Sequence, residues 1–547
     1  MPLNRQLLYS AQRASLACAV LALAACGDGD GAGAPVPVPS PPPPPVVVFP
    51  PAPATGRVSG VAAFAAGCDG QGGVDTLYAE AEVEPHVAVH PQDPQRLIAA
   101  WQQNRWSGGS AQGLLGAVST DGGTTWTRIS APFSRCTGGT AANGGDYARA
   151  TDPWVAVAPD GTLHMMSLST LGGGFAAGSA NAMLASRSTD GGLTWSDPAT
   201  LIRDGQSAFN DKNTLTADPT SASFVYAVWD RITTQSTGPT WFARSTNGGV
   251  SWEAARSIHD PGTNNQTIGN LIVVIPGGPL AGTLINVFTQ IDGSGSSATL
   301  RVQRSTDRGV NWSAPITVAP LRAIGARDPQ SNLAVRDGAG IAQAAAAPNG
   351  DLYVVWQDAS FSGGQVDAIA IARSIDGGVT WSAPARVSPQ QQAAAFTPQV
   401  AVRADGAVAV TYFDLRSDTL DPTTLATEKW LAVSTDGGAT WREQRVADPF
   451  DLTMAPIAGG YFLGDYQGLV ASGAAFVPVY VQTTGAAAAN RTDVFAQRIV
   501  PVTTATGTVR AAGRFAEAGS TADAGFDGRV RAMLQRLLAR RAGRRPR

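Results

Sequence analysis

The chain has 547 residues, of which 44% are hydrophobic and 15% charged, with 62 glycines and 37 prolines. This composition favours many short strands joined by turns over long helices, so we expect an all-β protein. The net charge is −3, yet residues 510–547 hold ten arginines against three acidic residues, so the rest of the chain is acidic. Because phosphate recognition needs a basic surface, we expect no nucleic-acid partner.

Residues 1–25 have the pattern of a signal peptide. Arg5 and Arg13 precede an apolar run at residues 14–25 that is too short to span a bilayer as a mature helix. The sequence Leu-Ala-Ala-Cys at the end of this run resembles the lipobox of bacterial lipoproteins, which implies that Cys26 is lipidated. We therefore expect a protein of the bacterial cell envelope, either an outer-membrane lipoprotein held by a lipid anchor or a secreted protein.

Residues 26–55 are rich in glycine and then in proline, a composition that favours extended polyproline II and cannot bury a core. We interpret them as a tether. With Cys26 used for lipidation, Cys68 and Cys136 remain in the mature chain. Two such cysteines can form a disulfide in an oxidising compartment, but the sequence leaves their pairing open.

An eight-residue motif, typified by STDGGLTW, occurs six times at intervals of 57 to 69 residues. Self-similarity at this period predicts an array of equal structural units. The copies are Ser119–Trp126, Ser188–Trp195, Ser245–Trp252, Ser305–Trp312, Ser374–Trp381 and Ser434–Trp441.

Strand-like segments with alternating apolar residues surround each copy, three before it and one after it. Four antiparallel strands in about 60 residues are typical of the blade of a β-propeller. We favour seven blades over six and expect the propeller to cover residues 56–509, with Val58–Phe64 supplying the missing outer strand of the last blade. First strands are predicted near Pro85, Pro153, Asn213, Ile268, between Pro329 and Ala346, near Pro398 and near Gln467.

Residues 510–547 form a basic tail in which the apolar residues between Val530 and Leu538 follow helical spacing. We expect an amphipathic helix that packs on the body or trails free. Contact of this helix with an anionic surface is the alternative.

The repeated motif resembles the Asp box of the sialidase family, whose members include BNR-repeat propellers, and the resemblance covers roughly residues 80 to 500. It implies hairpins between third and fourth strands, in which the Asp accepts backbone N–H bonds. The Asp residues of the motif are then structural, and Asn247 is a variant whose amide oxygen still accepts. In that family the boxes lie on the face away from the active site, so we expect a site at the starts of the first strands and in the loops after the second strands.

Sialidases hold a substrate carboxylate with three arginines and use a Tyr nucleophile, a neighbouring Glu and an acid/base Asp. The resemblance implies Tyr466 as nucleophile with Asp465 beside it in place of Glu, and Asp152 or Asp211 as the acid/base. Where the family has an Arg at the first strand, this chain has Glu84. The predicted substrate-binding arginines are Arg231, Arg327 and Arg416, with Arg149 and Arg105.

Two functions are consistent with this pattern. The first is a tethered sialidase-like exo-glycosidase acting on glycan termini, and the second is a propeller that binds glycans or proteins without turnover. No residues have the spacing of a metal site, so we expect no cofactor, with a structural calcium ion at the Asp-rich strand starts as an alternative. We also expect a monomer.

Overall fold

The computed structural model describes residues 46–48, 56–62, 64–70, 75–234, 237–484, 491–504 and 525–541. The predicted signal peptide, Cys26 and most of the predicted tether lie outside these residues. Within the described ranges the chain forms strands, three short 3-10 turns and one α-helix, α1 (Phe526–Arg541), in the basic tail. None of the helices in these ranges is long and apolar enough to cross a membrane.

Antiparallel four-stranded sheets repeat along the chain, and each strand pairs with the next in sequence. Single bridges, such as Ala111 with Ala150, join some neighbouring sheets. The strands of the successive sheets are β3 (Leu77–Val89), β4 (Leu97–Trp106), β5 (Ala111–Ser119) and β6 (Thr127–Ile129); β7 (Arg149–Val157), β8 (Leu163–Leu171), β9 (Ala180–Ser188) and β10 (Ala199–Asp204); β11 (Ala208–Ala217), β12 (Val225–Thr233), β13 (Thr240–Ser245) and β14 (Arg256–His259); β15 (Gln266–Val274), β16 (Leu284–Asp292), β17 (Ser297–Ser305) and β18 (Ile316–Pro320); β20 (Gln343–Ala346), β21 (Leu352–Asp358), β22 (Ala368–Ser374) and β23 (Ala385–Arg386); and β24 (Ala395–Val402), β25 (Val408–Asp414), β26 (Ala426–Ser434) and β27 (Arg442–Arg445).

The last sheet combines the two ends of the described chain. β30 (Gly468–Ser472), β31 (Ala475–Thr483) and β32 (Thr492–Ala496) pair in order, and β2 (Gly56–Arg57) pairs antiparallel with β32. The N-terminal segment therefore supplies the outer strand, as predicted. Its ladder is at Gly56–Arg57, and the predicted Val58 follows it and donates its N–H to the Val494 carbonyl at 2.8 Å. Beside this sheet, β1 (Val46–Val48) pairs with β33 (Val502–Thr504).

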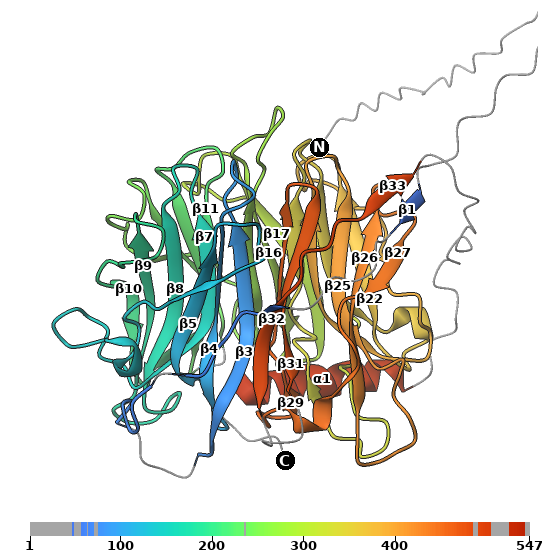
Figure 1. Cartoon of the computed structure of the whole chain (residues 1–547), viewed down its shortest axis with the longest axis horizontal. Coiled ribbons are helices and arrows are strands. Elements are labelled where there is room, and N and C mark those ends of the chain that lie inside the picture. The colour runs from blue at the N-terminus through green and yellow to red at the C-terminus, as the bar shows by residue number, and fades with distance from the viewer. Residues whose placement is uncertain are drawn as a thin grey trace, which may run out of the picture. The chain divides into compact units, whose positions relative to one another are not determined.

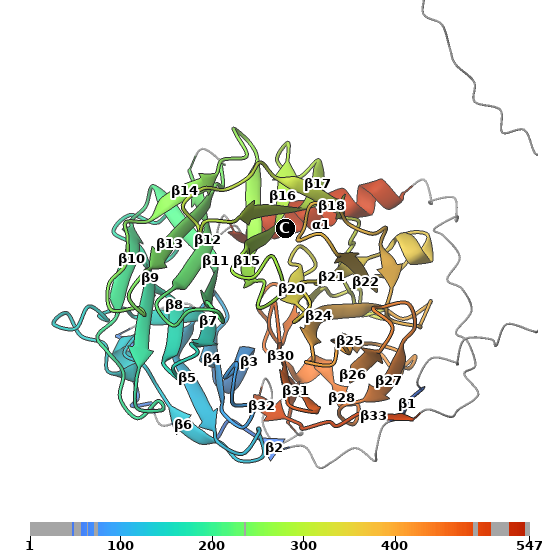
Figure 2. The ribbon, with the colours of Figure 1, turned by 90° about the horizontal axis from the view of Figure 1, so that it is seen from above.

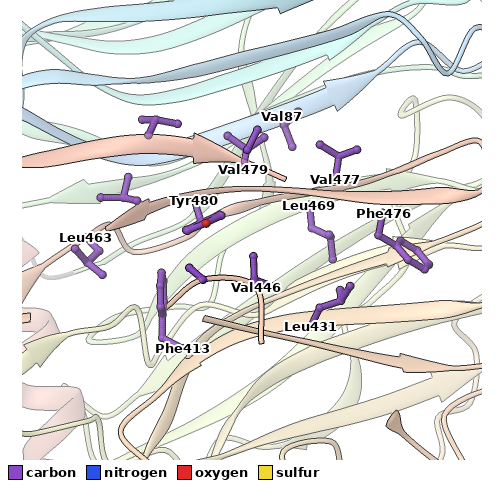
Figure 3. Packing of buried hydrophobic residues seen from close by; sticks show 14 of the residues in the cluster. Val87, Phe413, Leu431, Val446, Leu463, Leu469, Phe476, Val477, Val479 and Tyr480 are labelled. Carbon is purple, nitrogen blue, oxygen red and sulfur yellow. The ribbon is translucent and has the colours of Figure 1, made fainter. Parts of the chain in front are cut away.

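Seen from above, the sheets follow one another around a common axis in chain order (Figure 2). Each first strand contacts the next, through β3, β7, β11, β15, β20, β24 and β30, and β30 contacts β3. Val87 on β3, Leu469 on β30 and Val479 on β31 share one hydrophobic cluster, part of which Figure 3 shows. Burial of this apolar surface stabilises the junction between the first and last sheets. The chain thus has the all-β propeller fold that the sequence predicts.

The repeated motifs lie in the turns between third and fourth strands. In the copy between β5 and β6, Asp121 Oδ1 accepts hydrogen bonds from the backbone N–H groups of Thr124 and Thr125. The Ser119 hydroxyl donates to Asp121, and the Trp126 indole donates to the backbone carbonyl of the motif's second glycine. In the variant copy, Asn247 Oδ1 accepts from the N–H of Ser251.

Short elements complete the described chain, and a disulfide joins Cys68 to Cys136. The sequence had left this pairing open. The remaining elements are β19 (Val335–Arg336), β28 (Phe450–Asp451), β29 (Tyr461–Phe462) and the 3-10 turns η1 (Arg135–Thr137), η2 (Ser360–Ser362) and η3 (Leu452–Met454).

Candidate functional site

A β-bulge recurs near the start of the first strands and turns selected side chains toward the axis. The ladders of β3, β7 and β11 each shift register around one residue with positive φ, namely Glu84 (53°), Asp152 (51°) and Lys212 (51°). Positive φ is unfavourable for residues other than glycine, so its recurrence at one place in the repeat marks a constrained site. Bulges of this kind re-aim side chains, and these three converge.

Lys212 lies at the centre of the convergence, its side chain only 9% exposed. Its ammonium is 2.6 Å from Asp465 Oδ2 and 3.7 Å from carboxylate oxygens of both Glu84 and Asp152. One buried cation thus lies beside three acidic side chains that come from β3, β7 and the segment before β30. Attraction to these carboxylates outweighs the cost of burial and raises the pKa of Lys212, so the ammonium stays charged.

Asp465 is the most strongly stabilised carboxylate of the cluster. Arg336, on β19, donates from Nε to Asp465 Oδ1 at 3.0 Å and from Nη2 to Oδ2 at 2.6 Å. Although burial opposes ionisation, the charges of Arg336 and Lys212 hold the pKa of Asp465 well below its usual range. Asp465 is therefore ionised at neutral pH and cannot donate a proton.

Glu84 lies beneath this layer, 1% exposed, and has the opposite protonation behaviour. Burial raises the pKa of Glu84 to about 8, with Lys212 opposing and Asp152 and Asp465 adding to the rise. Its Oε1 accepts the backbone N–H of Asp465 at 3.1 Å, and its Oε2 accepts from the Gln102 amide. Glu84 is thus largely protonated at neutral pH and fixes the position of Asp465.

Above the cluster is a cavity of about 430 Å³. Its lining mixes carboxylates, guanidinium groups, glycine backbone and the Phe209 ring, a combination of donors, acceptors and one aromatic face that suits a polar ligand. The ionisable side chains that line it are Asp75, Arg105, Arg149, Asp152, Asp211, Lys212, Arg336, Asp465, Arg540 and Arg541.

Five residues predicted from the sequence share this cavity: Arg105, Arg149, Asp152, Asp211 and Asp465. Arg149 pairs with Asp75 at 2.9 Å, and its guanidinium lies over the Trp106 ring at the edge of the cavity. Arg105 lies deeper, and burial lowers its pKa to about 10.

Tyr466 does not reach the cavity. Its side chain is 4% exposed, and its hydroxyl donates to the backbone carbonyl of Pro153 at 3.2 Å, with the ring against Trp154. Burial raises the pKa of Tyr466 well above 10. A Tyr nucleophile needs a base that accepts its proton, whereas in this geometry the Tyr466 hydroxyl donates to a backbone carbonyl.

The predicted arginine triad is not assembled. Arg231 pairs bidentately with Asp204 at 2.7 Å and lies over the Trp241 ring. Arg327 and Arg416 line a separate cavity of about 1030 Å³. Arg231 lies within the second strand β12, Arg416 follows the second strand β25, and Arg327 lies in the segment before β20. None of the three lines the cavity around Lys212.

Sequence reasoning did not assign roles to Lys212, Arg336 or Glu84. Arg336 belongs to the segment between β18 and β20, where the repeat gives no guide. A signal for the bulges did exist, because Glu84, Asp152 and Thr397 each precede a proline inside a first strand, and proline within a sheet is confined to edges and bulges. For the calcium alternative, no group of three or more potential metal ligands is found among the residues that the structure describes.

The chain was compared with known proteins. Residues 95–333 match the BNR repeat-like domain family. No curated protein matches the chain. Similar solved structures include a protein of unknown function from Dyadobacter fermentans (15% identity, TM-score 0.43, covering 78% of this chain and 97% of that one). They also include a Hadza microbial sialidase (16%, 0.41, 74% of each chain) and an α-L-arabinanase of Penicillium chrysogenum in complex with arabinobiose (15%, 0.39, 64% and 95%).

Such identities and scores carry neither an activity nor a substrate over to this chain. The match over residues 95–333 and the six copies of the motif show that this part of the chain is similar to the BNR repeat-like domain family.

Proposed function

We propose that the protein recognises the terminal sugar of a glycan in the cavity around Lys212 and does not hydrolyse it. The observation that carries this proposal is the hydrogen bonding of the carboxylates that line the cavity. Both oxygens of Asp465 accept from Arg336, and both oxygens of Asp152 accept from Thr151 and Lys212. These groups are fixed as acceptors, which suits sugar hydroxyls but leaves no carboxyl free to deliver a proton.

Hydrolysis at glycan termini is the second candidate, because Asp152 and Asp465 line the same cavity on two sides of Lys212. Most glycosidases use two carboxyl groups that flank the bond to be cleaved. In this version Asp465, ionised at neutral pH, takes the role of nucleophile that the sequence assigned to Tyr466, and Asp152 keeps its predicted role as acid/base.

A matched pair of arginines tests the site. Arg149 and Arg231 each pair with one Asp and lie over one Trp ring, 4.7 and 4.8 Å from its centroid, but only Arg149 lines the cavity. On a glycan array and in titrations with the ligand found there, Arg149→Gln should weaken binding about tenfold and Arg231→Gln should leave it unchanged. Equal effects would place the ligand elsewhere, and release of a fluorogenic sugar that Asp465→Asn abolishes would favour hydrolysis.

We further propose that the propeller has seven blades, that its motifs are Asp boxes and that residues 1–25, 26–55 and 510–547 are signal peptide, tether and tail. The closed series of contacts from β3 to β30 supports seven blades. An anchored envelope protein is supported by the Cys68–Cys136 disulfide, since disulfides persist in oxidising compartments. Labelling of the cells with a fatty-acid analogue should mark the natural chain and not Cys26→Ser, and size-exclusion chromatography should show a monomer.

A further inference from the structure

Helix α1 lies across the face of the propeller where the first strands begin (Figure 1). Phe526, Val530, Met533 and Leu534 are buried in one cluster with residues of the segment before β20, including Ile324 and Ile341. The propeller therefore buries the apolar side of helix α1. At its C-terminal end, Leu537, Arg540 and Arg541 complete the lining of the cavity around Lys212.

The body of the propeller leaves room for this helix. A Cβ at Gly340 would lie 2.6 Å from Leu537 Cδ2, and one at Gly295 would lie 3.2 Å from Leu538 Cδ1. The φ of Gly340 lies outside the left-handed range that favours glycine, so its missing side chain serves the contact rather than the backbone. The sequence of the body is thus shaped to receive α1.

Arg541 enters a slot made by β11, β12 and β15. Its Nε donates to Asp211 Oδ2 at 3.2 Å, and its Nη2 donates to Asp230 Oδ2 at 2.5 Å. Its Nη1 donates to Gln266 Oε1 at 3.2 Å and to the Thr267 carbonyl at 3.0 Å. All three guanidinium nitrogens are used, and the Arg541 side chain is 4% exposed.

The slot depends on a cation. Asp230 is fully buried, and its other oxygen accepts only a neutral donor, the Asn270 amide, at 2.9 Å. Burial raises the pKa of Asp230 to about 7 even though Arg541 opposes the rise. A carboxylate in such a place is stable only when it is paired, and Asp211 adds a second negative charge beside it. The planar fork of a guanidinium matches this pair and the two neutral oxygens.

We propose that the slot between Asp211 and Asp230 is a guanidinium-binding subsite next to the cavity, and that Arg541 is its tethered occupant. Undocking of α1 then opens the cavity and frees the slot for the arginine side chain of another ligand. Asp211 lines both the slot and the cavity, which couples the two events. Control of glycan access rests on the proposed function, whereas the guanidinium subsite does not.

Chemical rescue in the whole chain tests this proposal. In Arg541→Ala, hydrogen exchange of the α1 amides should become at least tenfold faster, because the end of the helix loses its anchor while Asp230 loses its partner. Arg531→Ala is the control, since Arg531 is an exposed residue of the same helix. Guanidinium chloride at a few millimolar should raise the unfolding midpoint of Arg541→Ala by giving Asp230 a new partner, and tetramethylammonium chloride at equal concentration should not. Unchanged exchange, or equal effects of the two salts, would overturn the proposal.

Arg541→Ala in the complete chain provides a second measurement, because it empties the slot. It should bind N-acetylarginine amide at least tenfold more tightly than N-acetylcitrulline amide, which has the same shape without the charge. Adding Asp230→Asn should remove the difference, and the natural chain should show none. If Arg541→Ala does not discriminate between the two amides, the slot is only an anchor for α1 and the proposal fails. Neither readout involves a glycan, so failure here is distinct from failure of the glycan site.

Discussion

Two lysines are buried in this propeller, and the same substitution should change the stability in opposite directions. Lys212 has three acidic side chains within 3.7 Å. Lys429, on β26, has no hydrogen-bond partner among the described residues, and its ammonium lies 4.0 Å from the centroid of the Phe413 ring. Methionine is close to lysine in length and flexibility, so Lys212→Met and Lys429→Met differ mainly in the charges that they leave behind.

The magnitudes follow from these surroundings. Removing one partner of a buried ion pair costs about 3 to 5 kcal/mol, because the other charge is left uncompensated, and we expect that loss for Lys212→Met. Removing an unsatisfied buried polar group recovers its desolvation cost of about 1 to 3 kcal/mol, and we expect that gain for Lys429→Met. Burial lowers the pKa of Lys429 well below 10.5, so between the lowered pKa and 10.5 the unfolded chain binds more protons than the folded chain. The gain should therefore shrink as the pH rises toward 10.

Thermal and urea unfolding followed by tryptophan fluorescence and circular dichroism would measure both variants at pH 7. The unfolding midpoint should fall for Lys212→Met and rise for Lys429→Met. If both midpoints fell by similar amounts, the depth of burial and not the pairing of charge would decide the outcome, and the account of the Lys212 cluster would be refuted.

Three further outcomes are expected. Because the pKa of Glu84 is raised to about 8, the folded chain holds a proton between about pH 4.5 and 8 that the unfolded chain releases. The free energy of unfolding should therefore fall by up to about 1.4 kcal/mol per pH unit as the pH rises through this window. In Glu84→Gln the unfolding midpoint should depend less on pH. Tyr466→Phe should lower the free energy of unfolding by about 1 kcal/mol, the contribution of the hydrogen bond to the Pro153 carbonyl, and should change glycan affinity by less than twofold. A tenfold loss of affinity in titrations would show that the hydroxyl contributes to the glycan site. Cys68→Ala should lower stability by about 2 to 5 kcal/mol, and equal midpoints of the natural chain with and without reductant would contradict the contribution of the disulfide to Cys136.

The architecture could be predicted because the repeat is local. Each motif closes its own turn through contacts within eight residues, as the bonds from Asp121 to Thr124 and Thr125 show. The alternation of the flanking strands is also local. Asp152, Asp211 and Asp465 could be predicted as site residues because all three lie at the starts of first strands, a position that the repeat also defines.

The partners of these carboxylates could not be predicted in the same way. Lys212 and Asp465 are 253 residues apart in the chain, and Arg336 and Asp465 are 129 apart. Their meeting depends on the bulges and on the long segments before β20 and before β30, which carry Arg336 and Asp465. Position in the repeat can also mislead. Arg231 was predicted from its position in the repeat, but its side chain does not line the cavity around Lys212.

The pairing of β2 with β32 has a consequence for synthesis. Ser59, just after β2, and Val494 in β32 are bonded although 435 residues separate them. At about 5 to 20 residues per second, the ribosome needs roughly 20 to 90 seconds to make the intervening chain. During that time β2 has no strand to pair with, so the edge of the last sheet stays open in the nascent protein until β32 has been made.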